Sequence, residues 1–270
     1  MIHCKLHGRL GNNLFQIATA LSQASKLNAK VTIDKKTHAG HRGYIDTDFS
    51  MFSYEFEQLE SSGLTVEYNE TTLHFKEFFI EDDTVLSGYF ASWKYFDDIR
   101  EELLNFYFLP SNSVQKSLSK YIVSEKSLGI SVRRGDFLML QNNHCVLTLE
   151  YYQDVINKYF KDNIDSIYIF SDDIEWCKGV FGDEVNYVED TIGTQLFLMS
   201  KMKNLILSNS TFAWWGAYLN QNSGIIVAPD PWLGPAHDDK NTNDIYYPSW
   251  IRHTHERKLQ EYTFNESFYK

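Results

Sequence analysis

The sequence predicts an α/β protein made of two doubly wound domains, because short apolar runs alternate with helical segments and polar loops follow the runs. In the C-terminal half the apolar runs lie at residues 128–132, 164–170, 185–188, 205–207 and 225–228. The helical segments between them lie at residues 149–160, 193–201 and 211–219. Strand and helix in repetition predict parallel strands joined by right-handed crossovers. Ligands of such a domain bind at the carboxyl ends of the strands.

The N-terminal half predicts a second βαβ unit. Residues 2–6 and 31–33 have the apolar character of strands, and they flank a turn-rich loop at 8–13 and a helix at 14–26. A further strand is predicted at 84–90 and a further helix at 92–104, whereas residues 34–80 are ambiguous. Because the polar stretch at 110–119 separates the halves, we expect an N-terminal domain over residues 1–112 and a C-terminal domain over residues 113–270.

Composition narrows the class of protein. A chain of 270 residues with 43% hydrophobic residues can form one large core or two small ones. The net charge of −11 argues against binding to nucleic acid or to an anionic membrane through bulk charge. The cysteines Cys4, Cys145 and Cys177 lie far apart, so we expect neither a disulfide framework nor a zinc site. Since the start of the chain lacks an apolar signal-peptide core, and no run approaches the ~20 apolar residues of a membrane span, we expect a cytoplasmic protein.

An arginine pair follows the predicted strand at 128–132. The planar forks of Arg133 and Arg134 donate several hydrogen bonds and keep their charge, which suits a diphosphate. Gly135 allows close approach of the backbone, and Asp136 could orient an arginine or bind a hydroxyl group of a ribose or sugar. The alternative is an exposed arginine pair that forms salt bridges with nearby acids. These four residues alone do not decide between the two interpretations.

Two further loops have residues that suit anions. Ser210 and Thr211 open the predicted helix at 211–219, where they could cap free backbone N–H groups and where a phosphate could bind. An ordinary capped helix explains the same residues. Gly8, Gly11 and Asn12 lie in the turn between the first strand and its helix, but the loop lacks the pattern of a P-loop or a full dinucleotide fingerprint.

Two acids follow the predicted strand at 164–170. A carboxylate of Asp172 or Asp173 could accept hydrogen bonds from the N1–H and N2–H₂ edge of a guanine. Acids at the start of a helix are also favoured by the macrodipole, and the sequence does not separate these interpretations. The chain has no convincing Asp-x-Asp or histidine cluster, so we expect no metal. Cationic side chains can themselves stabilise the charge of a leaving group.

Taken together, these loops resemble the bacterial α-1,2-fucosyltransferase family, glycosyltransferase family 11, which also includes the animal blood-group H transferases. Six pieces occur in the family's order: GRLGNNLFQIA near the start, GYFASWKYFDDIR at 88–100, VRRGDF at 132–137, LTLEYY at 147–152, FSDDIEWCK at 170–178 and SNSTFAWWGAYL at 208–219. The resemblance implies a GT-B-type fold with two Rossmann-like domains that face a cleft. It places the acceptor on the N-terminal domain and the GDP-sugar donor on the C-terminal domain.

The activity that the resemblance implies is an inverting, metal-independent transfer of L-fucose from GDP-β-L-fucose without a cofactor. The acceptor would be a hydroxyl group such as O2 of a terminal galactose, which makes the enzyme a galactoside 2-alpha-L-fucosyltransferase forming an α-1,2 linkage. A transferase for another GDP-6-deoxysugar and a non-catalytic glycan-binding relative are the alternatives. The implied acceptor is a galactose-containing oligosaccharide or lipid-linked glycan of O-antigen or lipopolysaccharide. The enzyme would work in the cytoplasm, with peripheral association at the inner face of the bacterial membrane, and would not bind nucleic acid.

The resemblance also assigns the site. The residues that it implies as donor-binding are Asn12, Arg133, Arg134, Asp172, Asp173, Ser210 and Thr211. Those that it implies as catalytic are Arg133, Arg134 and Asp136. The candidates for a base are Asp136, His144 and Glu150, which lie near the arginines in sequence. One position departs from the family, because Ser131 stands where the family usually has His. This difference could accompany another GDP-6-deoxysugar donor.

Overall fold

The computed structural model describes residues 1–40, 43–161 and 163–262. The chain forms two compact units, the first made of Met1–Gln115 with Asn241–Tyr246 and the second of Lys116–Lys240 with the chain from Tyr247 onward. The return of 241–246 to the first unit differs from the contiguous domain expected after residue 112. Its physical cause is a set of polar contacts, since Asp244 accepts a hydrogen bond from the Phe75 N–H at 2.9 Å and pairs with Lys94 at 2.6 Å.

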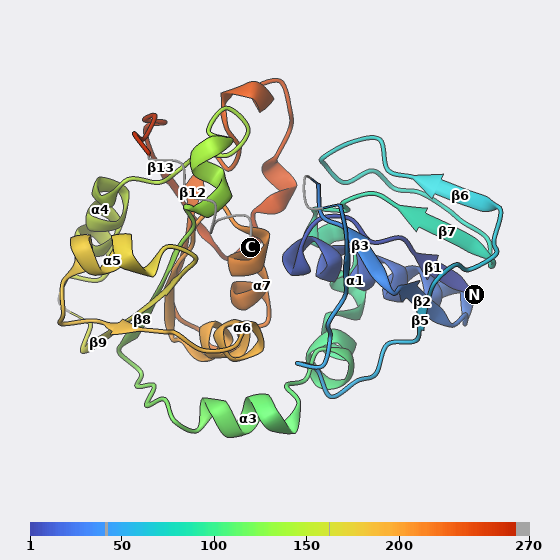
Figure 1. The fold of residues 1–270 in the computed structure, drawn as a ribbon, viewed down its shortest axis with the longest axis horizontal. Helices are drawn as coiled ribbons and strands as arrows, with labels where there is room; N and C mark the ends of the chain where they lie inside the picture. The colour runs from blue at the N-terminus through green and yellow to red at the C-terminus, as the bar shows by residue number, and fades with distance from the viewer. Residues whose placement is uncertain (41–42, 162, 263–270) are drawn as a thin grey trace. The chain divides into compact units, whose positions relative to one another are not determined.

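The second unit contains a six-stranded sheet in which all neighbours are parallel (Figure 1). Its order is β10 (Asn186–Tyr187), β9 (Ser166–Ser171), β8 (Ser127–Val132), β11 (Asn204–Ile206), β12 (Ile226–Asp230), β13 (Ile251–Thr254). The chain runs outward from β8 to β10 and then returns to β11 on the other side of β8. The strand order therefore reverses between β8 and β11, which is where open α/β sheets bind ligands.

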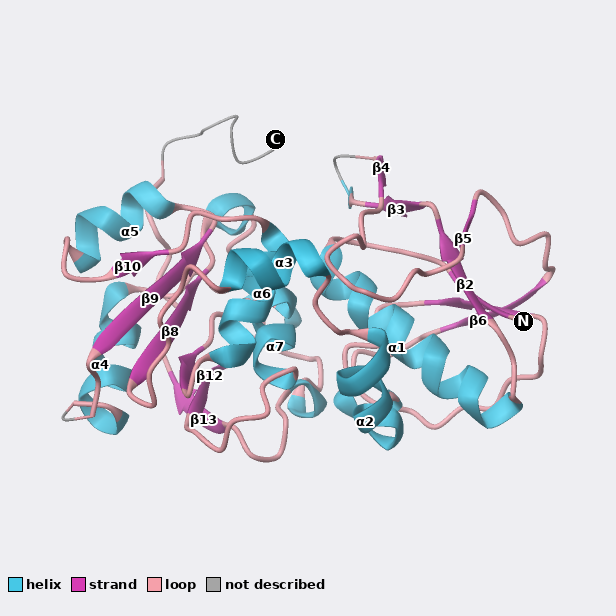
Figure 2. Ribbon diagram, turned by 90° about the horizontal axis from the view of Figure 1, so that it is seen from below, coloured by secondary structure: helices cyan, strands magenta, loops and turns pink. Residues whose placement is uncertain are grey.

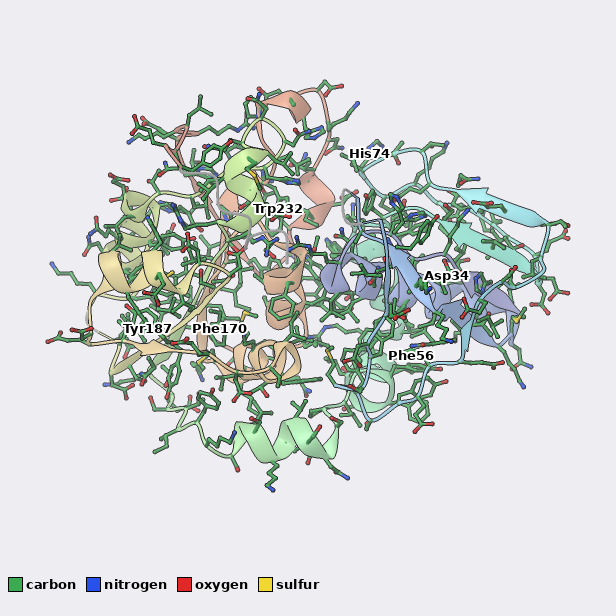
Figure 3. All side chains as sticks on the ribbon, viewed as in Figure 1. Asp34, Phe56, His74, Phe170, Tyr187 and Trp232 are labelled. Carbon is green, nitrogen blue, oxygen red and sulfur yellow. The ribbon has the colours of Figure 1, made fainter. Side chains whose placement is uncertain are left out.

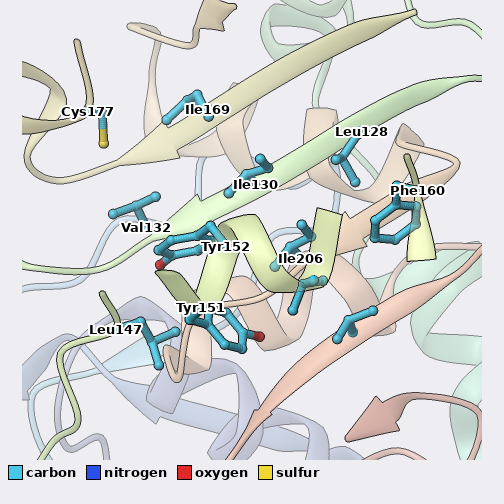
Figure 4. Close-up of a cluster of buried hydrophobic side chains, with 12 residues drawn as sticks. Leu128, Ile130, Val132, Leu147, Tyr151, Tyr152, Phe160, Ile169, Cys177 and Ile206 are labelled. Atoms are coloured by element: carbon cyan, nitrogen blue, oxygen red, sulfur yellow. The ribbon is translucent and has the colours of Figure 1, made fainter. Parts of the chain in front are cut away.

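Helices cover both faces of this sheet. Figure 2 shows α4 (Leu149–Tyr159) and α5 (Ile174–Phe181) on one side of it, and α6 (Ile192–Lys201) and α7 (Thr211–Tyr218) on the other. The core under α4 contains Tyr152 and Val155 packed on Leu128, Ile130 and Val132 of β8 (Figure 4). Burying each such side chain contributes roughly 1.5–3 kcal/mol. This core holds the carboxyl end of β8, and the loop after it, in one place.

The first unit contains a five-stranded parallel sheet of its own. Its order is β5 (Gln58–Leu59), β2 (Val31–Asp34), β1 (Ile2–Cys4), β7 (Thr84–Ser87), β6 (Val66–Asn69). Helix α1 (Leu10–Leu27) packs on this sheet, and β3 (Lys36–His38) pairs with β4 (Tyr44–Asp46) as a small hairpin. Asp34, labelled in Figure 3, ties β2 to β1 because it accepts a hydrogen bond from the Leu6 N–H and contacts the His3 ring. The strand order of this sheet reverses between β1 and β7.

Two predicted segments differ from the structure in the first unit. The helix predicted at 14–26 begins at Leu10, so Asn12 lies in its first turn and not in a loop. The helix predicted at 92–104 is instead a series of short turns: 3₁₀ at Trp93–Tyr95 and Asp97–Ile99, α at Arg100–Glu102 and π at Leu103–Tyr107. The break falls at Phe96, whose φ of −147° and ψ of 6° lie outside the helical region. Its fully buried ring packs edge-on against Phe15 of α1, and that contact outweighs a continuous helix.

The polar stretch at 110–119, expected to be a boundary, contains the helix α3 (Asn112–Leu118). The three cysteines are free and buried. Within the described residues, none of the helices combines the length and the apolarity that crossing a membrane requires.

Candidate active site

Arg133 follows β8 and is held by two carboxylates. Its Nη2 donates to Asp136 Oδ1 at 2.6 Å, and its Nη1 lies 2.9 Å from Asp172 Oδ2. The guanidinium also lies over the Phe137 ring, 5.1 Å from the centroid. Of the two roles considered for Asp136, orienting an arginine is therefore the one seen. The pair is not exposed as the surface salt-bridge interpretation required, since only 19% of the Arg133 side chain is accessible.

Arg134 is more deeply buried and less completely paired. Its Nε donates to Asp173 Oδ2 at 3.0 Å, and its guanidinium stacks 4.0 Å above the Trp176 ring of α5. Only 7% of the side chain is accessible, and the buried Nη1 has no hydrogen-bond partner among the described residues. A buried donor without an acceptor costs free energy, about 1–3 kcal/mol and more where the donor is charged. Arg134 thus keeps an unused, desolvated cationic donor at the switch point of the sheet.

Asp172 joins the ends of β8 and β9. Its Oδ1 accepts a hydrogen bond from the Arg134 backbone N–H at 2.9 Å while Oδ2 faces Arg133. Burial raises the pKa of Asp172, and the charge of Arg133 opposes that effect. A Cβ at Gly135 would lie 2.2 Å from Asp172 Oδ2, so the carboxylate occupies the space that any larger residue at 135 would need.

Asp173 has a structural role at the same place. It is the N-cap of α5, where its Oδ1 accepts a hydrogen bond from the Trp176 N–H at 3.2 Å while its Oδ2 holds Arg134. Both acids that were considered as readers of guanine are therefore bound to the arginine loop. Each carboxylate oxygen has two lone pairs, so these contacts hold both acids at the arginine loop and still leave acceptor capacity on their oxygens.

The loop after β11 lies on the other side of the switch point. Ser210 is the N-cap of α7 and accepts a hydrogen bond from the Phe212 N–H at 3.3 Å, and Thr211 is the first residue of that helix. The hydroxyl groups of Ser131 and Ser208 are buried and lie 2.9 Å apart, so Ser131 links β8 to this loop. The start of α7 and the arginine loop therefore belong to adjacent strands, and a helix N-terminus favours anions.

The three candidates for a base have different surroundings. Asp136 is engaged with Arg133, as described above. Glu150 lies in the first turn of α4, where the Thr148 hydroxyl lowers the pKa of its exposed carboxyl group. His144 stacks on Phe137 with the ring centroids 4.2 Å apart and an interplanar angle of 10°. Burial lowers the pKa of His144 to about 4, against the opposing charge of Asp136. His144 is therefore neutral at pH 7.

The depressed pKa of His144 predicts acid sensitivity. Its value is 6.5 before folding and about 4 in the fold, so the unfolded chain binds the extra proton between these pH values. Stability should fall as the pH drops through this window, by on the order of 3 kcal/mol from this group alone. His144→Phe keeps a ring on Phe137 and removes the titratable nitrogens, so its urea-unfolding free energy should depend less on pH. Equal pH dependence in the two proteins would contradict the assignment.

Asn12 belongs to the first unit. Its amide packs over Gly8, where a Cβ would lie 2.2 Å from Asn12 Nδ2 and where φ is +81°. Glycine is required there for both reasons. The sequence interpretation did not identify two aromatic platforms of the second unit, Phe137 and Trp176, under the guanidinium groups. Phe137 lies in the VRRGDF motif beside the arginine pair, and Trp176 lies in the FSDDIEWCK motif beside the acid pair. This nearness in sequence is the signal that could have identified them.

Metal ligands were not expected from the sequence. Over the described part of the chain, no group of three or more His, Cys, Asp or Glu side chains is placed to hold a metal ion.

Comparison with known proteins identifies the family. A model described as Glycosyl transferase family 11 matches residues 64–254. The chain belongs to glycosyl transferase family 11. As a family 11 member it is a glycosyltransferase, and the matched range contains the arginine loop, the acid pair and the start of α7. Asn12 lies outside that range.

Relatives of this family 11 chain include bacterial and animal enzymes. An alpha-1,2-colitosyltransferase of Escherichia coli is 28% identical, over 93% of this chain and 98% of its own length. The O-antigen biosynthesis glycosyltransferase WbnK of Escherichia coli is 34% identical, over 57% of this chain and 52% of its own length. Galactoside alpha-(1,2)-fucosyltransferase 1 of Mus musculus is 25% identical, over 82% of this chain and 64% of its own length.

Solved structures agree on the fold. POFUT1 in complex with GDP-fucose superposes with a TM-score of 0.55 at 11% identity, over 83% of this chain and 94% of that one. The fucosyltransferase NodZ from Bradyrhizobium gives a TM-score of 0.54 at 12% identity, over 80% and 91% of the two chains. These likenesses show an α/β fold with parallel sheets, as the sequence predicted.

Proposed function

We propose that this family 11 chain is an inverting fucosyltransferase that moves L-fucose from GDP-β-L-fucose to a galactose hydroxyl group, with O2 as the attacking atom and an α-1,2 linkage as the product. The observation that carries the proposal is the buried, unpartnered Nη1 of Arg134 beside Arg133 at the switch point. A diphosphate oxygen would supply the missing acceptor. The solved neighbours that hold GDP or GDP-fucose support the same assignment.

In the proposed reaction the acceptor hydroxyl oxygen forms a bond to the anomeric carbon as the bond from that carbon to the diphosphate oxygen breaks. GDP leaves with the electron pair, and the hydroxyl proton passes to a base or to water. Arg133, Arg134 and the start of α7 stabilise the growing negative charge on the diphosphate. Such preorganised donors act most strongly where water is excluded. Attack from the opposite side turns the β donor into an α product.

The charges at this site set a condition on donor binding. Asp136, Asp172 and Asp173 outnumber the two guanidinium groups that they contact. A diphosphate would therefore add negative charge to a cluster that already has an excess of it. We propose that the donor replaces a carboxylate on Arg133, while Asp173 stays on Arg134 because it also caps α5. The carboxylates then keep the forks oriented before the donor arrives.

Calorimetric titration with GDP, UDP and ADP tests the nucleotide. The proposed mechanism uses no metal or cofactor, so the titrations are made in EDTA. We expect GDP to bind more tightly than UDP or ADP, and Arg134→Ala to weaken GDP binding. Lack of GDP binding by the folded protein would overturn the proposal, as would binding that requires a divalent cation.

A second donor is favoured by a specific observation. The colitosyltransferase relative matches almost the whole chain and almost its own full length, and Ser131, which stands where the resemblance implies His, forms a buried hydrogen bond with Ser208. The alternative is therefore transfer from another GDP-6-deoxysugar, such as GDP-colitose. Competition between GDP-fucose and GDP-colitose for one acceptor separates the two, because the true donor should have the larger kcat/KM. Consumption of neither donor would favour a non-catalytic glycan-binding protein.

The remaining parts of the proposal concern the acceptor. We propose a GT-B enzyme in which the first unit binds a galactose-containing oligosaccharide or lipid-linked glycan and the second unit binds the donor. The names of the Escherichia coli relatives support a place in O-antigen biosynthesis. Such a reaction would take place in the cytoplasm, at the inner face of the membrane.

A further inference from the structure

The first unit has a switch point of its own, between β1 and β7 (Figure 1). The two strands are parallel and in register from Ile2 opposite Thr84 to Cys4 opposite Leu86. The loops that follow them therefore leave the same edge of the sheet side by side. The first contains His7, and the second begins with Gly88, Tyr89 and Phe90 of a family motif that the proposed donor site does not use.

The second loop is held rigidly by a carboxylate. Glu70, which follows β6, accepts hydrogen bonds through Oε2 from the Tyr89 N–H at 2.8 Å and the Phe90 N–H at 2.7 Å. A Cβ at Gly88 would lie 2.4 Å from the Glu70 Cβ, so the turn packs directly on this side chain. Phe90 is buried among Tyr68, Phe78 and Tyr95. The loop backbone is thus fixed on both sides.

Tyr89 is the exception in this loop. Tyr89 is 47% exposed, although its backbone N–H is bound by Glu70. Neighbouring aromatic residues point inward and contact one another, whereas Tyr89 has no ring contact among the described residues. An exposed ring on a fixed backbone loses little conformational entropy on binding, and it offers an apolar face with a polar tip.

The first loop contributes an imidazole with a free nitrogen. His7 is half-buried, and its Nε2 lies 3.3 Å from the Ser87 hydroxyl, while no hydrogen bond to Nδ1 occurs among the described residues. Burial and the charge of Lys5 lower the pKa of His7, so the ring is neutral at neutral pH. Its backbone is clamped, because the His7 N–H donates to Gln16 Oε1 at 3.0 Å and the His7 carbonyl accepts from Asn13 Nδ2 at 3.1 Å.

We propose that His7 and Tyr89 form the acceptor-sugar subsite of this enzyme, with the apolar face of a galactose ring on Tyr89 and one of its hydroxyl groups bound to the free nitrogen of His7. This inference rests on the proposed function and names the residues that recognise its acceptor. A sugar complements both side chains at this edge of the sheet, because its apolar face of C–H groups suits the Tyr89 ring and its hydroxyl groups suit the His7 nitrogen. The fixed backbones of both loops preorganise the pair.

Steady-state kinetics with methyl β-D-galactoside as the acceptor probe test the subsite. Tyr89→Ala should raise the KM for the galactoside about tenfold or more, and His7→Phe should also raise it, with the Kd for GDP unchanged in both. Tyr89→Phe and Tyr89→Trp keep the aromatic face and should stay near the wild-type KM. His7→Gln keeps a polar atom at this position and should recover part of the loss.

Phe79 provides the matched control, since it is another exposed aromatic residue of the same unit, with 87% of its side chain accessible. Phe79→Ala should leave both constants unchanged. Wild-type acceptor KM in Tyr89→Ala and His7→Phe, with intact GDP binding, overturns this inference and leaves the proposed function standing. If the wild-type protein does not bind GDP, the proposed function itself is contradicted.

A fall in both GDP affinity and thermal stability in Tyr89→Ala would signal misfolding. In that case saturation-transfer NMR on the wild-type protein decides the question. We expect galactoside C–H signals that vanish in Tyr89→Ser and persist in Phe79→Ala. Persistence of those signals in a folded Tyr89→Ser protein overturns the subsite.

Discussion

Replacing Arg134 with alanine should lower turnover about a hundredfold or more, because it removes a preorganised cationic donor from a water-poor site. The side chain is 7% exposed, its Nε is fixed by Asp173, and its Nη1 has no partner in the part of the chain that the structure describes. Trp176 and Asp173 hold the fork in position before any ligand binds, so little reorganisation accompanies the reaction. The fold should survive, since Asp173 keeps its bond to the Trp176 N–H and stays at the helix N-terminus.

Single-turnover rates with saturating GDP-fucose measure this effect, and thermal unfolding checks the fold. Arg134→Lys should also be slow, because a point charge cannot reproduce the Nε contact and the free Nη1 together. Lys203→Ala is the control. Lys203 directly precedes β11, so it lies at the amino end of that strand, away from the arginine loop, where it pairs with Glu125. Near-normal turnover in folded Arg134→Ala would remove the diphosphate assignment.

The alternation of apolar runs and helices was enough to predict the central parallel strands of the second unit, because β8, β11 and β12 are buried on both faces. It was not enough for β13, whose residues alternate between exposed and half-buried at the sheet edge. It also did not reveal α5, which is only eight residues long and starts from an acid that could equally end a loop. Short or half-exposed elements are defined by tertiary contacts that a local pattern does not contain.

The site shows the same division. The sequence put the arginines and the α7 cap at strand ends, and the structure places them on adjacent strands. The sequence could not predict the hydrogen-bond partners of Asp172 and Asp173, because these partners depend on the register between β8 and β9. Val132 of β8 lies opposite Ser171 of β9, which sets Asp172 beside the Arg134 backbone. That pairing is a property of the sheet, and it makes Asp172 a support of the arginine loop, a role that the sequence did not predict.

Gly135→Ala should cost roughly a hundredfold in turnover, as expected for catalytic groups displaced by an ångström. An added Cβ would lie 2.2 Å from Asp172 Oδ2, a separation that real contacts do not show. The backbone at Gly135 has no positive φ, so the effect is steric and acts through the carboxylate. Once Asp172 moves away, Arg133 Nη1 loses its partner and the Arg134 N–H loses its acceptor. The Arg133 fork then keeps only its bond to Asp136, and the backbone that carries Arg134 loses a support.

A matched glycine separates this effect from helix propensity or general strain. Gly179 lies in α5, and a Cβ there meets nothing within 4 Å. Gly179→Ala should therefore keep full turnover and stabilise the fold by about 0.5–1 kcal/mol. A double-mutant cycle with Asp172→Ala completes the test. If Gly135→Ala acts by displacing Asp172, it should change little in the Asp172→Ala background, because the group that it displaces is already gone. Additive losses in rate would show that residue 135 acts through another contact, such as close approach of its backbone to the donor.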